Sequence, residues 1–353
     1  GRRPASEALD ECRKRLEKVL DPPRAGRWEC FLVAGISGPW LVLLPMEDLE
    51  EALAPPFEPI LLFFLCLGAS LVYAQAAVPT AAIGVGQPVG ALILSLAGAS
   101  ELARRAAADR WGVRLGLPLL LPSNVVGTFG ACTRVLSPVP DAIAGFDIAA
   151  SAVAAPLLAS LLLVLLGLLM PAEGRDCVWV NPGLFPSLLQ RAVFSSAEAH
   201  WPVCPGPPPS GASPIAVPAN PAVVAGSMGA LVAALNALPL GRLDGMAVVA
   251  AVDAPSLRDV ALPWAALVLL GSATLTSDAD GLFPLVLTFS FFTFFVRPQL
   301  APKQVLRDNV TQPRDAVRQA LALLLTLAAF ALLTPAAVLD SLAPALPPRG
   351  LDR

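Results

Sequence analysis

The stretch AVVAGSMGALVAALNALPLGRLDG, residues 222–245, joins a long apolar run to a carboxylate at its end. Asn236 and Pro239 precede the acid, Asp244, and Gly245 follows it. A carboxylate at the edge of a hydrocarbon segment is costly to keep there and is usually tied to function. We therefore interpret this segment as a membrane-embedded helix that ends in a candidate functional site.

The composition of the whole chain places this segment in a membrane protein. Of the 353 residues, 56% are hydrophobic and 14% are charged, whereas soluble domains carry about 25% charged residues. The net charge of −3 gives no reason to expect a nucleic-acid partner. We expect an integral membrane protein whose immediate partner is lipid.

The apolar runs give the architecture. A transmembrane helix needs about 20 apolar residues, and fewer when it packs inside a bundle. The sequence therefore predicts an all-α polytopic membrane protein with about eight transmembrane helices, over residues 31–45, 59–77, 81–103, 148–170, 222–240, 261–276, 281–296 and 316–338. Small residues crowd the third and fifth of these runs and let helix backbones approach closely. We expect those two helices to touch each other.

The chain divides into three parts by composition. Residues 1–28 form a polar segment with an amphipathic helix over 7–20, which lies either in solvent or on the membrane surface. Residues 29–340 form the transmembrane domain and include a proline-rich loop at 171–221; residues 341–353 form a C-terminal tail. The six cysteines include no CxxC pair, so we expect neither a disulfide framework nor a zinc knuckle.

Two motifs resemble a known family. NALPLGRLDG at 236–245 is similar to the Asn-x-x-Pro-x-x-x-Leu-Asp-Gly signature of the site-2 proteases, which are intramembrane zinc metalloproteases. The stretch 121–156 resembles the plastid branch of that family, the ethylene-dependent gravitropism-deficient and yellow-green proteins. It has that branch's Gly-x-Phe-Gly loop, its Pro-Asp pair and its helix-opening Asp, here Gly127, Phe129, Gly130, Pro140, Asp141 and Asp147. The resemblance covers about residues 80–340 and implies a chloroplast membrane, thylakoid or another plastid membrane.

The resemblance also implies a zinc site that this sequence has altered. In the family, His-Glu-x-x-His supplies two zinc ligands and a general base, and the Asp of Leu-Asp-Gly completes the site. The corresponding segment here is Ser100-Glu101-Leu102-Ala103-Arg104. Glu101 stands at the vestigial base position, while Ser100, Arg104 and Asp244 stand at the vestigial ligand positions. Because a serine hydroxyl is a poor zinc ligand and arginine has no lone pair to give, we expect no bound metal.

The same resemblance implies substrate-docking residues: Gly127, Phe129, Gly130, Asn236 and Pro239. The glycine-rich segment is expected to form a small re-entrant or β-like loop near 125–135 that binds an extended substrate by β-augmentation; an ordinary turn is the alternative. Asn236 would orient a substrate backbone, or it would make a hydrogen bond between helices. The cluster of phenylalanines at 289–295 is expected to be packing or lipid-facing surface.

A charged side chain inside a membrane nearly always has a partner. We therefore predict that Arg104 forms an ion pair with Asp244, with Glu101, or with both. This prediction rests on one base and two acids that fall where the family places its metal site.

Three functions fit these observations. The leading one is a catalytically inactive pseudoprotease that binds or regulates membrane clients, with transmembrane proteins or an active protease relative as partners. The second is an active intramembrane metalloendopeptidase that holds zinc through atypical ligands. The third is a transporter or channel in which Glu101, Arg104 and Asp244 line a polar path.

Overall fold

The computed structural model describes residues 5–19, 28–35, 38–45, 59–76, 86–123, 125–169, 177–180, 215–218, 220–250, 256–276, 282–300, 306–308 and 315–334. Two of the sequence predictions fall mostly or wholly elsewhere. The proline-rich loop lies outside the described residues apart from two short strands, and the C-terminal tail at 341–353 lies wholly outside them.

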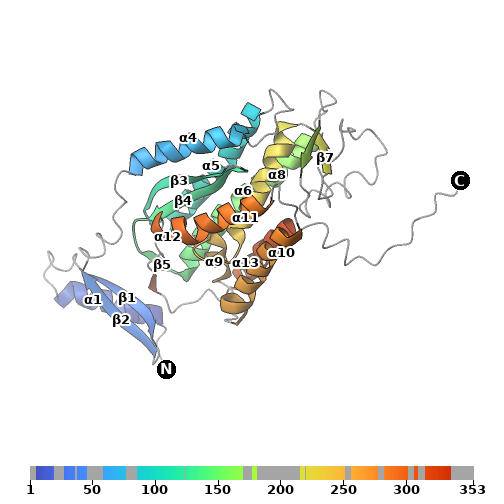
Figure 1. Ribbon diagram of the computed structural model, residues 1–353. Helices are drawn as coiled ribbons and strands as arrows, with labels where there is room; N and C mark the ends of the chain where they lie inside the picture. Colours follow the sequence, from blue (N-terminus) through green and yellow to red (C-terminus); the bar gives the residue numbers. More distant parts are fainter. Residues whose placement is uncertain are drawn as a thin grey trace.

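Helices make up most of the described chain (Figure 1). The principal ones are α1 (Ala5–Val19), α4 (Pro59–Ala76), α5 (Gly86–Arg110), α6 (Ala142–Leu169), α8 (Pro221–Ala237), α9 (Asp244–Val249), α10 (Leu262–Thr276), α11 (Leu282–Phe291), α12 (Arg297–Leu300) and α13 (Ala316–Leu333). Two π-helical turns precede α10 and α12, at Leu257–Ala261 and Phe292–Val296. Seven of the eight predicted apolar spans therefore coincide with helices, although several helix ends differ by a few residues.

The strands form three small sheets. They are β1 (Trp28–Gly35), β2 (Gly38–Pro45), β3 (Leu115–Ser123), β4 (Gly127–Val135), β5 (Val139–Asp141), β6 (Cys177–Val180), β7 (Ile215–Pro218) and β8 (Leu306–Asp308). The largest sheet has the order β2-β1-β8-β5, while β3 pairs with β4 and β6 pairs with β7. Because β8 pairs in parallel with both β1 and β5, this sheet joins the N-terminal elements to the start of α6.

The prediction of a transmembrane helix over 31–45 is wrong, because this segment belongs to the antiparallel hairpin of β1 and β2. The pairing closes at Gly35 and Gly38, so the glycines divide the apolar run into two strands of eight residues each. A short apolar run cannot be told from a buried helix by hydropathy alone. Helix α1 confirms the predicted amphipathic helix, and it packs its Leu9 against Cys30 and Leu32 of β1.

Membrane-spanning length is present in fewer helices than predicted. Among the described residues, Ala142–Gly167 and Ala316–Leu333 are long and apolar enough to cross a membrane. Four further apolar helices are shorter: Ile60–Tyr73, Pro221–Ala237, Asp259–Gly271 and Leu285–Leu300. The structure thus supports a mainly helical protein with two candidate spans, and it does not support eight.

The bundle is held together around α8. A Cβ added at Gly229 would lie 2.3 Å from Leu96 Cδ1 of α5 and 2.5 Å from Ser160 Oγ of α6, and one at Gly226 would lie 2.7 Å from the Ser160 carbonyl oxygen. Such spacing is open only to glycine, so small residues bring α8 against both neighbours. The predicted contact between the third and fifth apolar runs, here α5 and α8, is confirmed.

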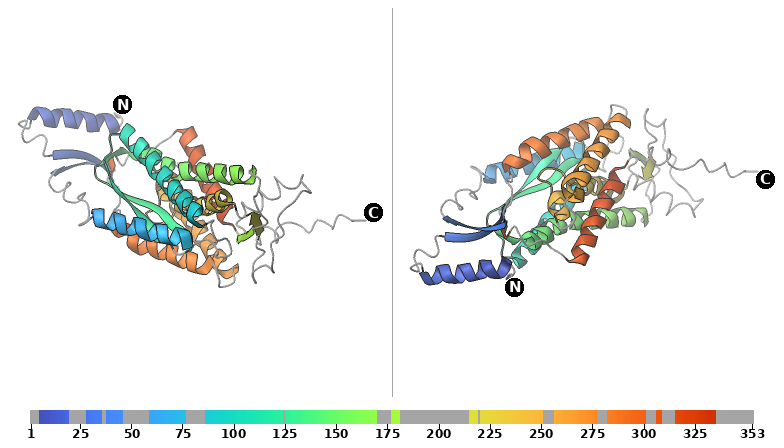
Figure 2. Two further views of the ribbon diagram at one scale, coloured as in Figure 1. Left: turned by 90° about the horizontal axis from the view of Figure 1, so that it is seen from above. Right: turned by 90° about the horizontal axis from the view of Figure 1, so that it is seen from below.

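The β-like loop predicted near 125–135 is confirmed as the hairpin of β3 and β4, which lies between α4 and α5 (Figure 2). Gly127 and Gly130 have φ values of 82° and 93°. Residues other than glycine rarely adopt these angles. The Gly-x-Phe-Gly spacing therefore sets the backbone path by which β4 enters the bundle.

Candidate functional site

Asp244 and Arg104 form the centre of the site. Arg104, on α5, donates from Nη1 to Oδ1 of Asp244 at 2.9 Å and from Nη2 to Oδ2 at 2.7 Å. The two side chains are 6% and 11% exposed. A guanidinium bound through two parallel hydrogen bonds matches the geometry of a carboxylate and is a strong form of ion pair. The ion pair predicted from the sequence is confirmed.

A second arginine binds the same carboxylate. Arg297, the first residue of α12, donates from Nη2 to Oδ2 of Asp244 at 3.1 Å and from Nη1 to Oδ1 of Asn236 at 2.8 Å. Its side chain is 5% exposed. No motif predicts a role for this residue, although the sequence carries a signal: Arg297 is the only charged residue between 282 and 300. Asp244 is therefore enclosed by two guanidinium groups.

Glu101 is buried and lies close to three other side chains. Its Oε2 accepts a hydrogen bond from Thr133 Oγ1 of β4 at 2.6 Å and lies 3.7 Å from Arg104 Nε. Its Oε1 lies 2.7 Å from Arg105 Nε. Arg104 thus pairs with both acids, which is one of the predicted arrangements. Its contact with Asp244 is the shorter one, 2.7 Å against 3.7 Å for Glu101. The Glu101 side chain is directed into the protein and is 7% exposed as a residue, and the bond to Thr133 ties α5 to β4.

Ser100 contributes its hydroxyl to helix packing. Its Oγ donates to the carbonyl oxygen of Ala152 in α6 at 2.7 Å. This hydrogen bond joins α5 to α6 beside the ion pair. Ser100, Glu101 and Arg104 thus each have a protein partner, and Arg104 is the one of the three that binds Asp244 directly.

Asn236 connects the ion pair to β4. Its Nδ2 donates to the carbonyl oxygens of Phe129 at 2.8 Å and of Val232 at 2.9 Å, while its Oδ1 accepts from Arg297. The hydrogen bond between helices that the sequence left open is present, from Arg297 of α12 to Asn236 of α8, and a further bond joins α8 to strand β4. The Phe129 ring is buried and lies 5.6 Å from the ring of Phe289. Phe129 is therefore a packing residue here, and its use in docking stays a prediction.

The turn between α8 and α9 explains why Asp244 reaches the core. After Pro239 the chain turns back, with Gly241 at φ 53°, and Asp244 becomes the first residue of α9. A carboxylate is favoured at a helix N-terminus by the helix dipole. A Cβ at Gly245 would lie 2.0 Å from the carbonyl oxygen of Ala237. The Leu-Asp-Gly spacing thus packs α9 directly on the end of α8.

This packing gives a prediction for Gly245→Ala. The added methyl group would overlap the backbone of Ala237, and overpacking of this kind costs about 3 kcal/mol of unfolding free energy. We expect a lower midpoint of thermal unfolding in detergent. Gly98→Ala is the matched control, because nothing lies within 4 Å of that Cβ position and alanine favours a helix over glycine by about 1 kcal/mol. Equal stability of the two variants would contradict the packing argument.

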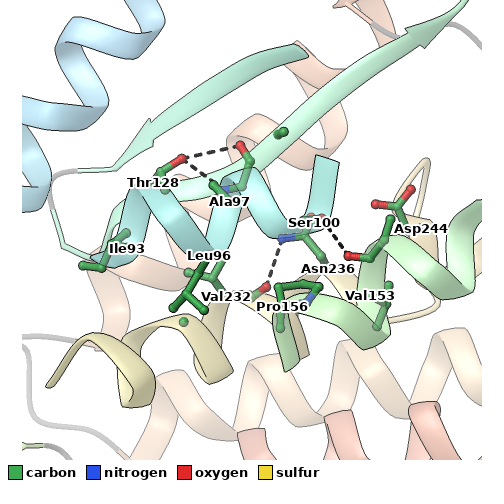
Figure 3. Close-up of a pocket in the computed structure, with 15 residues that line it drawn as sticks. Ile93, Leu96, Ala97, Ser100, Thr128, Val153, Pro156, Val232, Asn236 and Asp244 are labelled. Atoms are coloured by element: carbon green, nitrogen blue, oxygen red, sulfur yellow. Dashed lines mark hydrogen bonds between the residues drawn. The ribbon is translucent and has the colours of Figure 1, made fainter. Parts of the chain in front are cut away.

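A pocket borders the ion pair. Elements α5, α6, α8 and β4 line it, and Ser100, Asn236 and Asp244 gather at one end while Ile93 and Thr128 lie toward the other (Figure 3). Most of its remaining lining is apolar. The pocket therefore offers an apolar wall that runs along β4 to a polar end at Asp244.

Comparison with known proteins identifies relatives of this chain. It is 30% identical over 257 residues to "Probable zinc metalloprotease EGY3, chloroplastic" of Oryza sativa subsp. indica, which covers 70% of this chain and 42% of that protein. It is 31% identical over 231 residues to the probable zinc metallopeptidase EGY3 of Arabidopsis thaliana, covering 63% of this chain and 38% of that protein. The chain is an EGY homologue of the site-2 protease family.

The similarity extends to other EGY proteins. The Arabidopsis thaliana probable zinc metalloprotease EGY2 is 29% identical over 227 residues, covering 64% of this chain and 38% of that protein. This EGY homologue spans less than half the length of these curated relatives. No protein-family model matches the chain, and no solved structure matches it.

The relatives are named as zinc proteins, and the residues at this site do not fit that metal. A catalytic zinc needs about three protein ligands and an open position. Both oxygens of Asp244 are bound by guanidinium groups, and the Ser100 hydroxyl is bound to a backbone carbonyl. Among the described residues, no three His, Cys, Asp or Glu side chains gather as a ligand set. A dication beside Asp244 would meet the charges of Arg104 and Arg297.

Proposed function

We propose that this EGY homologue is a catalytically inactive site-2 protease relative that binds or regulates membrane clients. The main support for this proposal is the pair of hydrogen bonds from Arg104 to Asp244, together with the hydrogen bond from Arg297 to the same carboxylate. In this proposal two arginines supply the positive charge that a zinc ion supplies in the family. The helices and the hairpin then keep their arrangement without a metal.

The arrangement of α5, α8 and β4 supports a binding role. Asn236 fixes β4 to α8 through the Phe129 carbonyl, and Glu101 fixes β4 to α5 through Thr133. These bonds hold one wall of the pocket in place beside the ion pair. We propose that an extended part of a transmembrane client lies along this wall. The surface on which the client lies is then shaped by Gly127, Gly130, Asn236 and Pro239. The apolar lining favours an apolar client segment.

The proposal includes a location. The relatives are named as chloroplastic, and two helices of this chain are compatible with a membrane. We therefore place the protein in a plastid membrane, with lipid as its surroundings and transmembrane proteins, or an active protease relative, as partners.

Metal content and proteolysis test the proposal together. We expect the purified full chain, equilibrated with zinc and then desalted, to retain far less than one zinc per chain by elemental analysis. We also expect it to leave a membrane-embedded peptide uncut in detergent or nanodiscs. Zinc near one per chain with chelator-sensitive cleavage would establish the alternative of an active metalloendopeptidase. An ion flux into proteoliposomes that depends on Asp244 would establish the transporter alternative.

Client binding is tested separately. The peptide that goes uncut should still be retained by the chain, measured by photocrosslinking from a probe residue at Val232, which lines the pocket. A probe at Val268 is the matched control, because this side chain is exposed on α10, 66% accessible. Equal crosslinking from the two positions would contradict a client seat in the pocket.

A further inference from the structure

Two thiols lie together at the N-terminal end of the molecule, far along the chain from the ion-paired site. The Sγ atoms of Cys12, on α1, and Cys30, on β1, are 3.5 Å apart although the residues are 18 positions apart in sequence. Both are free cysteines. No CxxC spacing marks them, so the fold alone brings them together.

The packing of α1 holds the pair in position. Leu9, one turn before Cys12, is buried against Cys30 and Leu32, and Cys12 packs against the same cluster. Cys30 is 2% exposed, whereas Cys12 is half-buried. A sulfur–sulfur bond is about 2.05 Å long, so the two sulfurs need to approach by about 1.5 Å.

We infer that Cys12 and Cys30 form a dithiol site that is oxidised to an intramolecular disulfide by a small or protein disulfide of the glutathione or thioredoxin class. Cys12 is the more exposed of the two and reacts with the oxidant first. Cys30 lies close enough to attack the Cys12 sulfur afterwards. The product fastens α1 to β1.

The exchange balances in two steps. The Cys12 thiolate attacks one sulfur of the external disulfide, a mixed disulfide forms, and the other half leaves as a thiolate. Cys30 then gives up its proton to water and attacks the Cys12 sulfur, and the second half of the oxidant leaves. The two cysteines lose two electrons and two protons, and the external disulfide becomes two thiols.

The charges around the pair agree with this order. Burial and the contact with Cys12 raise the pKa of the Cys30 thiol to about 11, so Cys30 is protonated near neutral pH and is not the first nucleophile. Arg13 and Arg307 both pair with Glu29 beside the thiols.

The position of β1 extends the effect of the disulfide beyond α1. Leu32 of β1 pairs with Asp308 of β8, and β8 also pairs with β5 directly before α6. A bond between Cys12 and Cys30 therefore fixes α1 to the sheet that joins the N-terminal elements to the bundle (Figure 1). A disulfide restrains the chain between its cysteines in the unfolded state.

The test treats the reduced full chain with glutathione disulfide, labels free thiols with N-ethylmaleimide, and maps the labels by mass spectrometry. Labelling of Cys12 and Cys30 should fall together by at least tenfold, with a crosslinked peptide and no glutathione retained on either residue. Cys66, on α4, is the internal control and should keep its label. Cys30→Ser should instead retain glutathione on Cys12, and Cys12→Ser should form no crosslink.

Three results of the labelling experiment would overturn the inference. They are unchanged labelling of both thiols after oxidation, a stable glutathione adduct on Cys12 in the parent chain, or a crosslink from either residue to another cysteine. Trypsin gives a second readout, because Lys14, Arg15 and Lys18 lie on α1. Cleavage at these sites should slow in the oxidised parent and stay unchanged in Cys30→Ser; equal rates before and after oxidation would also overturn it.

Discussion

Asp244→Ala should be among the most damaging single substitutions in this protein. It removes the one carboxylate that Arg104 and Arg297 share and leaves two buried guanidinium groups side by side. Breaking a buried pair by removing one partner costs about 3–5 kcal/mol. Arg104 would keep only its longer contact with Glu101 at 3.7 Å, and Arg297 would keep only the neutral Asn236. We expect little folded protein in the membrane fraction and a large fall in the midpoint of thermal unfolding of what is recovered.

A surface ion pair provides the matched control. Glu11 pairs with Arg15 on α1 at 2.6 Å, and these side chains are 38% and 75% exposed; exposed pairs contribute about 0–1 kcal/mol. Glu11→Ala should therefore unfold close to the parent. Asp244→Leu combined with Arg104→Met and Arg297→Met should recover much of the lost stability, because an apolar core can replace a buried ion pair. Parent-like stability of Asp244→Ala would refute the role given to the two arginines.

The pairing of Arg104 with Asp244 could be predicted because both residues stand in motifs with a known relation to each other. A charge inside a membrane needs a partner, and the family pattern puts these positions together. Arg297 stands in no such motif. Its neighbours in sequence are apolar, and only the turn into α12 brings it to Asp244 and Asn236.

The N-terminal hairpin shows a different limit. Residues 31–45 are apolar enough for a short transmembrane span. Hydropathy measures only this apolar character and does not distinguish a helix from a strand. The glycines at 35 and 38 divide the run, and pairing with the distant β8 supplies the sheet. A partner that lies more than 250 positions away leaves no local signal. The closeness of Cys12 and Cys30, 18 positions apart, could not be predicted because it depends on how α1 packs against β1.

Only the folded structure shows which hydrogen bonds Asn236 makes. The sequence left substrate binding and a structural hydrogen bond as alternatives. In the structure Nδ2 donates to the Phe129 carbonyl, and a Cβ at Gly130 would lie 3.2 Å from the same nitrogen. Asn236 therefore holds β4 close to α8, where a Cβ at residue 130 would be tightly packed and where the positive φ of 93° favours glycine. A client strand would have to compete with this bond or leave it intact, which is a constraint on docking that no motif reveals.

The second large effect is a gain of metal binding on restoring the family's ligands. Two histidines at positions i and i+4 of one helix face, with a nearby aspartate, make a ligand set for zinc. We expect Ser100→His with Arg104→His and Arg297→Gln to bind about one zinc per chain, measured by elemental analysis after desalting, since catalytic sites use about three such ligands. The parent should bind almost none.

Variants with and without Arg297 test whether its positive charge excludes zinc. The double variant Ser100→His with Arg104→His keeps Arg297 on Asp244, so its positive charge still opposes a dication. We expect the double variant to bind zinc at least tenfold more weakly than the triple variant, and Arg297→Gln alone to bind none. If the double and triple variants bind equally, Arg297 plays no part in excluding the metal. If the parent binds as well as the triple variant, the two arginines do not replace the ion, and the pseudoprotease proposal fails with them.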